Sequence, residues 1–195
     1  MQENNAASIA EANKKCAKAV TVDTSKLVYA DGTPVNLSST KAVKQWLRAK
    51  YHDTQAVISD DGQVVEFTTK GFGDDQKRKL DKTAQRLAYA DLDRIVENSI
   101  YYSSKSGDTR HEHVSRQKTY YGLINLNGRY YAVQIKIDLH KSKRAGFFKA
   151  LEVTEIKSPS LLHGGGLKKD LRSHQEEGDV LSVPVLEIKL AFDPH

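Results

Sequence analysis

Residues 118–137 (KTYYGLINLNGRYYAVQIKI) constrain the fold of this 195-residue chain more than any other stretch. Two runs of alternating β-branched, aromatic and polar residues flank the dipeptide Asn127-Gly128. A two-residue type I′ turn needs positive φ at both central positions, and asparagine and glycine adopt that conformation at low cost. The sequence therefore predicts a β-hairpin that turns at Asn127-Gly128.

The position of the turn also fixes which residues of the hairpin face each other. The predicted cross-strand pairs are Leu126 with Arg129, Ile124 with Tyr131, Gly122 with Val133, and Tyr120 with Ile135. Because successive side chains of a strand point to opposite faces, one face is apolar and carries Tyr120, Ile124, Leu126, Tyr131, Val133, Ile135 and Ile137. The other face carries Tyr121, Asn125, Tyr130, Gln134 and Lys136. We expect the apolar face to form a core and the other to be a platform that is open to a ligand.

Composition limits the class of protein without naming a function. Hydrophobic residues make up 38% of the chain and charged residues 28%, which is enough for a folded domain. The formal net charge of +5 suits nucleic acid or another anionic partner. The single cysteine, Cys16, excludes an intrachain disulfide and a cysteine-only zinc site. No apolar run approaches the roughly 20 residues that cross a bilayer, and no signal peptide is recognisable. The sequence predicts a cytoplasmic protein without membrane insertion.

The segments before the hairpin predict three helices and two further hairpins. An alanine-rich helix within residues 6–19 and a small hairpin over 26–37, turning at Asp31-Gly32, form a predicted N-terminal extension, residues 1–37. A helix capped near Ser39 covers residues 40–51. Residues 55–69 repeat the hairpin pattern, and an apolar stripe at helical spacing predicts a helix from about residue 74 to 99.

The segments around and after the hairpin complete the predicted fold. Residues 101–117 are polar and predict a long loop, and residues 147–156 predict a third strand. The predicted fold is α+β: a small antiparallel β-sheet (the hairpin plus a three-strand meander) with helices packed on one face. A central α+β domain then covers residues 38–158, and 159–195 form a flexible linker and a C-terminal segment. Residues 180–192 predict either an edge strand or a short helix.

The order of several segments resembles a known group of domains. These segments are KAVKQWLRAKY (residues 41–51), an Asp-Asp-Gly hairpin, LAYADLDRIVENSIYYS (87–103), a loop with histidines, YYGLINLNGRYYAVQIKI (120–137) and a closing strand. Together they resemble the large polyvalent protein-associated domains and related nuclease-like domains of phages and mobile elements. Those domains are grouped with the barnase–EndoU–colicin–RelE superfamily. The resemblance covers about residues 40–160 and implies a sheet with helices on one side and an RNA-cleaving site on its open face. It carries over no named catalytic residue.

Metal-independent RNA cleavage needs a base for the 2′-hydroxyl proton, an acid for the 5′-oxygen and cations around the phosphate. Histidine suits acid or base work because its pKa lies near neutrality. His111 and His113 alternate in the predicted loop, beside Arg110 and Lys118. We predict that the two histidines are catalytic and that the two cations bind substrate. The alternatives are a solvated polar loop or a zinc site, although further clustered ligands are lacking.

The predicted platform offers a second set of candidates. Lys136 and Gln134 should neighbour the third strand, on which Glu152 and Thr154 share a face. We predict Glu152 as general base and Lys136 as its catalytic partner, with Gln134 and Thr154 binding substrate. The alternative is that Lys136 and Glu152 form an ordinary cross-strand ion pair.

Aromatic and basic residues near the hairpin complete the predicted binding set. Tyr121 and Tyr130 could stack on unpaired bases, or be ordinary strand residues. Lys141, Lys143 and Arg144 could contact phosphates, or form a solvated basic turn. No metal ion and no cofactor is expected at the site.

The sequence therefore predicts an RNA endonuclease, with tRNA among its candidate substrates, that acts as a toxin or effector of phage or mobile-element origin. It would act in the cytoplasm of its own or a target bacterial cell, and in its own cell it would need a neutralising inhibitor protein. The alternatives are a catalytically inactive relative that binds nucleic acid or protein, or an interaction domain that recruits partners through an exposed sheet edge.

Overall fold

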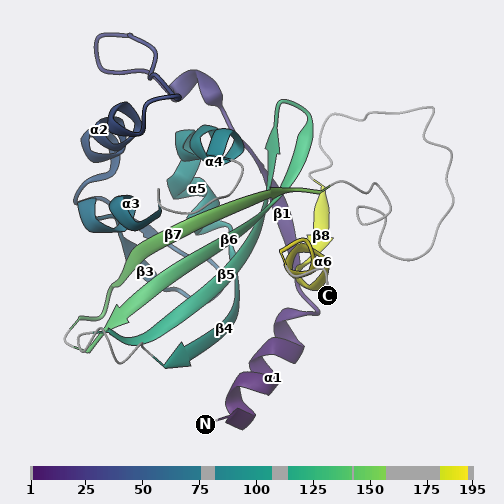
Figure 1. The fold of residues 1–195 in the computed structure, drawn as a ribbon. Helices are drawn as coiled ribbons and strands as arrows, with labels where there is room; N and C mark the ends of the chain where they lie inside the picture. The colour runs from purple at the N-terminus through teal and green to yellow at the C-terminus, as the bar shows by residue number, and fades with distance from the viewer. Residues whose placement is uncertain (1, 76–81, 107–113, 142, 157–180, 193–195) are drawn as a thin grey trace, which may run out of the picture.

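The computed structural model describes residues 2–75, 82–106, 114–141, 143–156 and 181–192. Within these residues, eight strands form one mixed sheet in the order β2-β3-β7-β6-β5-β1-β8, and β4 also pairs with β5 (Figure 1). The strands are β1 (Cys16–Thr21), β2 (Gln55–Val57), β3 (Val64–Glu66), β4 (Ile100–Ser106), β5 (Val114–Leu126), β6 (Arg129–His140), β7 (Gly146–Glu155) and β8 (Ser182–Pro184). The helices are α1 (Gln2–Ala12), α2 (Thr40–Tyr51), α3 (Thr69–Asp75), α4 (Lys82–Ala88), α5 (Leu92–Glu97) and α6 (Val185–Leu190). Two 3₁₀ turns cover Thr24–Lys26 and Tyr89–Asp91.

The central hairpin is formed by β5 and β6, and its predicted turn and register are confirmed. The four predicted cross-strand pairs are all present. Asn127 and Gly128 have φ values of 53° and 83°, as a type I′ turn requires. The Asn125 side chain accepts a hydrogen bond from the backbone N–H of Gly128 at 2.8 Å, which further fixes the turn.

The sheet is larger than predicted, and the expectation of a small antiparallel sheet is wrong in two respects. β1 runs parallel to β5, and β3 runs parallel to β7, so the sheet is mixed. β2, β3 and β8 have three residues each and extend the sheet at its two ends. The sequence indicated strand segments at β2, β3 and β8, but not their places in the sheet, because the pairing of distant segments leaves no local pattern.

The other segment predictions had mixed outcomes. The hairpin within residues 55–69 is confirmed as β2 and β3. Residues 26–37 also turn at Gly32, which has a φ of 81°, but their two arms are joined by a single antiparallel bridge, between Val28 and Pro34, and form no strands. The predicted long loop over residues 101–117 is wrong where the structure describes it, because β4 and the first residues of β5 occupy it and pair antiparallel. Their serine, lysine and glutamine side chains have low β-propensity, which the paired neighbours override. Strand β7 confirms the predicted third strand.

Helix α2 is confirmed over its predicted range, and the Ser39 side chain accepts from the Ala42 N–H as its N-cap. The predicted helix over residues 74–99 is instead divided: α3 begins at Thr69, and the turn Tyr89–Asp91 separates α4 from α5. The division has a physical cause, because Tyr51 Oη donates to the Tyr89 carbonyl at 2.8 Å and Lys50 Nζ donates to the Ala90 carbonyl at 2.6 Å. Within the described residues no helix is long and apolar enough to cross a membrane.

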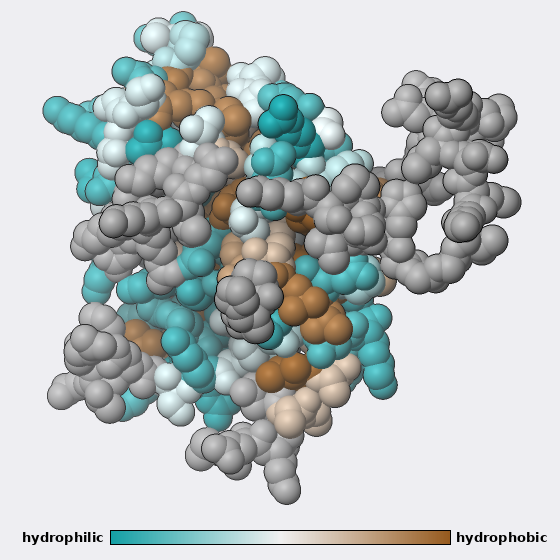
Figure 2. Space-filling model, turned by 45° about the vertical axis from the view of Figure 1, so that its right-hand side comes forward, coloured by the Kyte–Doolittle hydropathy of each residue, from teal (hydrophilic) through white to brown (hydrophobic). Residues whose placement is uncertain are grey.

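Helices cover both faces of the sheet, so the prediction that they pack on one face is wrong. The larger core lies between the sheet and the helices α2 to α5, and includes Trp46, Phe67, Phe72, Ile135 and Phe148. A second cluster lies on the other face, where α1, β8 and α6 cover Tyr121, Leu123 and Ala132. Figure 2 shows the side of the molecule that carries α6, with apolar surface among hydrophilic residues. Residues 182–190 contain both of the predicted alternatives, a strand followed by a short helix.

Gly71 holds α3 against β7 and gives a test of this packing. A Cβ atom on Gly71 would lie 2.0 Å from the Phe148 carbonyl oxygen, whereas a Cβ on Gly122 would meet nothing closer than 3.9 Å. We expect Gly71→Ala to lower the free energy of unfolding by about 1–3 kcal/mol. Gly122→Ala should raise it by about 0.5–1 kcal/mol, because a glycine inside a strand is unfavourable.

Urea unfolding followed by the fluorescence of Trp46, the single tryptophan, measures both variants. Equal effects of the two alanines would contradict the close approach of α3 to β7.

Candidate functional site

The half of the second sheet face that α1, β8 and α6 leave uncovered is polar. We call it the polar half-face; it is formed by Gln117, Gln134, Lys136, Asp138, His140, Phe147, Lys149 and Glu152, from strands β5, β6 and β7. Alternation along β6 places Gln134, Lys136, Asp138 and His140 on this face, because every second residue points the same way. The expected platform therefore exists over part of its length.

A β-bulge places one of the lysines on this face. The pairing of β6 with β7 shifts between Lys136, opposite Ala150, and Ile137, opposite Phe148, which leaves Lys149 as an extra residue. Simple alternation from Leu151, which is buried in the larger core, would turn Lys149 toward that core. Because of the bulge, the Phe148 side chain lies in the larger core, and the Lys149 side chain lies on the polar half-face.

Lys136 and Glu152 form the ion pair that the sequence suggested. Lys136 Nζ lies 3.0 Å from Glu152 Oε1, and the two side chains are 20% and 14% exposed. Directly opposite Glu152, Gln134 donates from its amide to the Tyr121 hydroxyl at 2.9 Å. The structure thus brings three of the predicted site residues, Gln134, Lys136 and Glu152, to neighbouring positions on one face.

Asp138 forms a second polar cluster farther along β6. Its carboxylate accepts from the Gln117 amide at 2.8 Å and lies 3.6 Å from Lys149 Nζ. Asp138 is only 8% exposed, so this carboxylate is held by an amide and an ammonium in a confined place. A carboxylate fixed in this way is a hydrogen-bond acceptor, as a general base must be.

His140 adds an imidazole next to Asp138 on the same face. Its ring packs against Phe147 with 4.5 Å between ring centroids and a tilt of 53° between the ring planes, and Lys143 Nζ lies 4.9 Å from the centroid of Phe147. Asp138, His140, Phe147 and three lysines (Lys70, Lys143 and Lys149) line a pocket of about 380 Å³, which we call the basic pocket. Within the described residues it brings a carboxylate, an imidazole and several cations together.

The two clusters are too far apart to act on one atom. Glu152 is paired with Gln134, six residues from His140 along β6. At about 3.3 Å per residue of strand, this separation is roughly 20 Å. A base at Glu152 and an acid at His140 cannot therefore share one scissile phosphate, whereas Asp138 and His140 line the same pocket.

The structure places the other predicted residues as follows. Lys118 lies on the opposite face of the sheet, where its Nζ lies 2.9 Å from Asp61 Oδ2 and 3.0 Å from Gln63 Oε1. Lys141, Lys143 and Arg144 are exposed in the β6–β7 turn. Thr154 is half-buried on β7, opposite Ala132. Arg110, His111 and His113 lie outside the described residues, so the structure does not place them.

The two platform tyrosines are engaged in packing. Tyr121 is 4% exposed, and its ring centroid lies 5.1 Å from that of Tyr102 and 6.0 Å from that of Phe192. Tyr130 packs against the same cluster beneath α6. The buried Tyr121 ring therefore presents no open face for stacking on a base, whereas Tyr130 is only partly buried.

Sequence reasoning missed Asp138, His140 and Lys149 as site residues. A usable signal existed for the first two, because Gln134, Lys136, Asp138 and His140 continue one period-2 polar row. The predicted strand ended at Ile137, which assigned Asp138 and His140 to a connection. Lys149 gave no such signal, because its position depends on the bulge.

No metal centre is recognisable among the described residues, since no group of three or more His, Cys, Asp or Glu side chains there could hold an ion.

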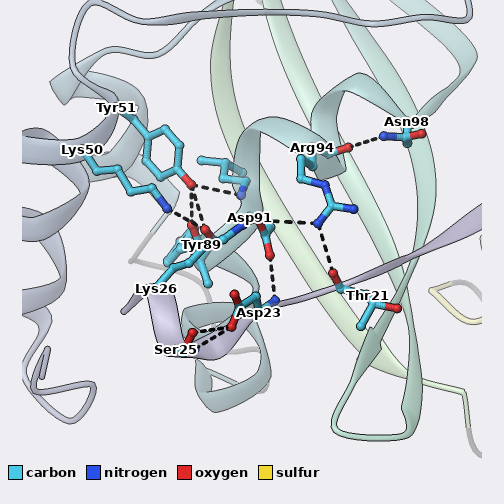
Figure 3. A network of polar contacts seen from close by, with 12 residues as sticks. Thr21, Asp23, Ser25, Lys26, Lys50, Tyr51, Tyr89, Asp91, Arg94 and Asn98 are labelled. Atoms are coloured by element: carbon cyan, nitrogen blue, oxygen red, sulfur yellow. Dashed lines mark hydrogen bonds and ion pairs between the residues drawn. The ribbon is translucent and has the colours of Figure 1, made fainter. Parts of the chain in front are cut away.

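A further concentration of charge, around Asp91, is structural (Figure 3). Asp91 is 1% exposed and accepts from the backbone N–H of Asp23 at 2.7 Å. It also pairs with Lys26 and lies 3.7 Å from an Arg94 nitrogen. Burial lowers the pKa of the nearby Lys50, whose ammonium donates to the Ala90 carbonyl. The network ties the segment after β1 to the helices of the larger core.

Comparison with known proteins places the chain in a family. The model of the family described as large polyvalent protein-associated domain 3 matches residues 36–146, more than half of the chain. The chain belongs to this family. Membership in the large polyvalent protein-associated domain 3 family supports a phage-associated domain. The match includes Lys136, Asp138 and His140 and ends before Lys149 and Glu152. Neither a curated protein nor a solved structure matches the chain.

Two buried tyrosines make the stability of the fold depend on pH above pH 10. Burial, with Asp61 nearby, raises the pKa of Tyr120 above the ordinary value of 10.0, and burial, with Asp93 nearby, does the same for Tyr51. Above pH 10 the unfolded chain loses these protons and the folded chain keeps them. The tyrosine contribution to stability is therefore complete below pH 10 and is lost as the pH rises toward the folded pKa.

Between pH 10 and its folded pKa, each tyrosine should lower the free energy of unfolding by up to about 1.4 kcal/mol per pH unit. We expect Tyr120→Phe to make the fall of unfolding free energy above pH 10 shallower in urea titrations. An unchanged slope in this variant would contradict the burial of the Tyr120 hydroxyl.

Proposed function

We propose that the chain is a metal-independent RNA endonuclease of phage or mobile-element origin whose cleavage centre is the basic pocket. The observation that carries this proposal is the meeting of Asp138, His140 and the pocket lysines in one cavity of about 380 Å³. The resemblance to nucleases of the barnase–EndoU–colicin–RelE superfamily supports the same chemistry on the same kind of sheet face.

Different residues of the basic pocket carry out the different steps of the reaction. Asp138 takes the proton of the 2′-hydroxyl, and the 2′-oxygen attacks phosphorus to give a 2′,3′-cyclic phosphate. His140 donates a proton to the departing 5′-oxygen, a task suited to a group that titrates near neutrality. The ammonium groups of Lys143 and Lys149 stabilise the negative charge that grows on the phosphate oxygens.

Such an enzyme acts as a toxin or effector on cytoplasmic RNA, with tRNA among its candidate substrates. In the cell that makes it, an RNA endonuclease requires a neutralising inhibitor protein. Expression without that inhibitor should therefore arrest growth, and variants that lose cleavage should relieve the arrest.

The proposal is tested with purified protein and total RNA, with and without a chelator. We expect cleavage in both conditions and products that end in 2′,3′-cyclic phosphate. Asp138→Asn and His140→Gln should each lower the rate about 10²–10⁴-fold, the usual contribution of a general acid or base. The asparagine keeps an oxygen that can accept from Gln117, so this variant should remain folded.

Glu152→Gln, His111→Ala and His113→Ala test the residues that the sequence alone suggested. We expect Glu152→Gln to change the rate less than tenfold, because its carboxylate lies roughly 20 Å along β6 from His140. Loss of activity in Glu152→Gln with full activity in Asp138→Asn would move the centre to Lys136 and Glu152. Intact RNA after incubation with the wild-type chain would overturn the enzyme proposal.

A second candidate is a catalytically inactive relative that binds nucleic acid or protein. The observation that favours it is that charges of the polar half-face neutralise one another, Lys136 with Glu152 and Lys149 with Asp138. Cross-strand pairs of this kind are common structural features of sheets. Binding of RNA that weakens steeply with salt, without any cleavage, would support this candidate.

A further inference from the structure

Helix α2 carries a basic surface that lies apart from the basic pocket. Its sequence, TKAVKQWLRAKY, contains four basic residues and no acidic one. Val43, Trp46, Leu47 and Tyr51 bury one side of the helix in the larger core. Lys41, Lys44 and Arg48 lie on the other side at spacings of three and four residues, so they are neighbours on one helix face. We call them the α2 triad.

The three cations of the α2 triad lie on one helix face without a neutralising carboxylate beside them. Several lysines on other elements are paired with carboxylates, as Lys15 is with Asp60 and Lys118 with Asp61. Within the described residues, no carboxylate lies within ion-pair distance of any member of the triad. Three unneutralised charges on one helix face repel each other, so an anionic partner would stabilise them.

The surface has a shape that suits an extended anion. Lys41, Lys44, Gln45, Arg48 and Thr40 line a shallow hollow of about 440 Å³ on the outer side of α2. Lys41 and Arg48 are seven positions apart in the helix, which corresponds to about 10 Å along its axis. A row of cations of this length can contact successive phosphates of one strand. The hollow offers no aromatic ring among these residues, so it suits a backbone rather than a base.

The position of α2 connects this surface to the basic pocket. Figure 1 shows α3 between α2 and the end of the sheet where the β6–β7 turn lies. Lys70 of α3 is exposed and lines the basic pocket. A strand that leaves the pocket past Lys70 can therefore continue across α3 toward the α2 triad.

We propose that the α2 triad is a second RNA-binding surface, which holds the phosphate backbone of the substrate outside the cleavage centre without regard to sequence. That the bound polyanion is RNA rests on the proposed function. That α2 carries an anion-binding surface is inferred from the positions of its three cations alone. The enzyme then favours long strands over short ones, because only a long strand reaches both surfaces.

The test compares two variants that lose the same charge. The first changes the α2 triad (Lys41→Gln, Lys44→Gln and Arg48→Gln), and glutamine keeps the helix propensity. The matched control changes three exposed lysines on other elements, Lys14→Gln, Lys18→Gln and Lys105→Gln. Thermal unfolding confirms that both variants fold. The probes are a 2′-O-methyl strand of about 30 nucleotides, which cannot be cleaved, and a cleavable trinucleotide.

We expect the triad variant to bind the long strand about tenfold or more weakly at 0.1 M salt. The slope of log affinity against log salt should become shallower by about 2, since each phosphate contact on a single strand contributes about 0.7. The control variant should keep the wild-type affinity and slope. Cleavage of the trinucleotide should be the same in all three proteins, because it cannot reach α2.

Equal weakening in the triad and control variants would overturn the inference, since net charge alone would then explain binding. A triad variant with unchanged RNA affinity would overturn it as well, and would leave an acidic protein as the partner of α2. Failure of the wild-type chain to cut the trinucleotide or the total RNA, with the binding difference intact, would overturn the proposed function alone.

Discussion

The alternation of side chains along β5 and β6 is the constraint on which the rest of the molecule depends. The Asn127-Gly128 turn locks the register, and a slip of one residue would exchange every core side chain for one of the other face. With this register, Tyr120, Ile124 and Ile135 are fully buried beneath the helices. The same register places Lys136, Asp138 and His140 together on the opposite face.

The second face is divided by what covers it. At one end, α1, β8 and α6 bury Tyr121 and Leu123, so this end serves packing. At the other end, the bulge in β7 places Lys149 beside Asp138, and the basic β6–β7 turn lies next to this pair. A confined carboxylate, an imidazole and several ammonium groups meet at this end, beside α3 and away from α1 and α6. Among the described residues, the chemistry of the site thus depends on which part of the sheet face α1 and α6 cover.

Turns, helix caps and side-chain spacing are local features of the sequence, and they predicted the elements that form within one segment of the chain. The Asn-Gly turn gave the hairpin register, and Ser39 with the apolar spacing of Val43, Trp46 and Leu47 gave α2. Pairing between distant segments was not predictable from the chain: β1 lies parallel to β5 only because the two meet in the folded sheet. The break at Tyr89–Asp91 depends on Tyr51, almost 40 residues earlier, which no local pattern reveals. The site was predicted in part for the same reason, since Asp138 and His140 continue an alternating row whereas Lys149 depends on a bulge.

The central claim, that the uncovered end of the second sheet face receives the ligand, is tested most directly by mapping amide chemical shifts during titration with an uncleavable 2′-O-methyl tetranucleotide. The account predicts that the largest shifts fall on β6 from Lys136 to His140 and on Lys149 of β7. Shifts centred instead on Tyr121, Leu123 and α6, or the absence of any shift along β6, would contradict it.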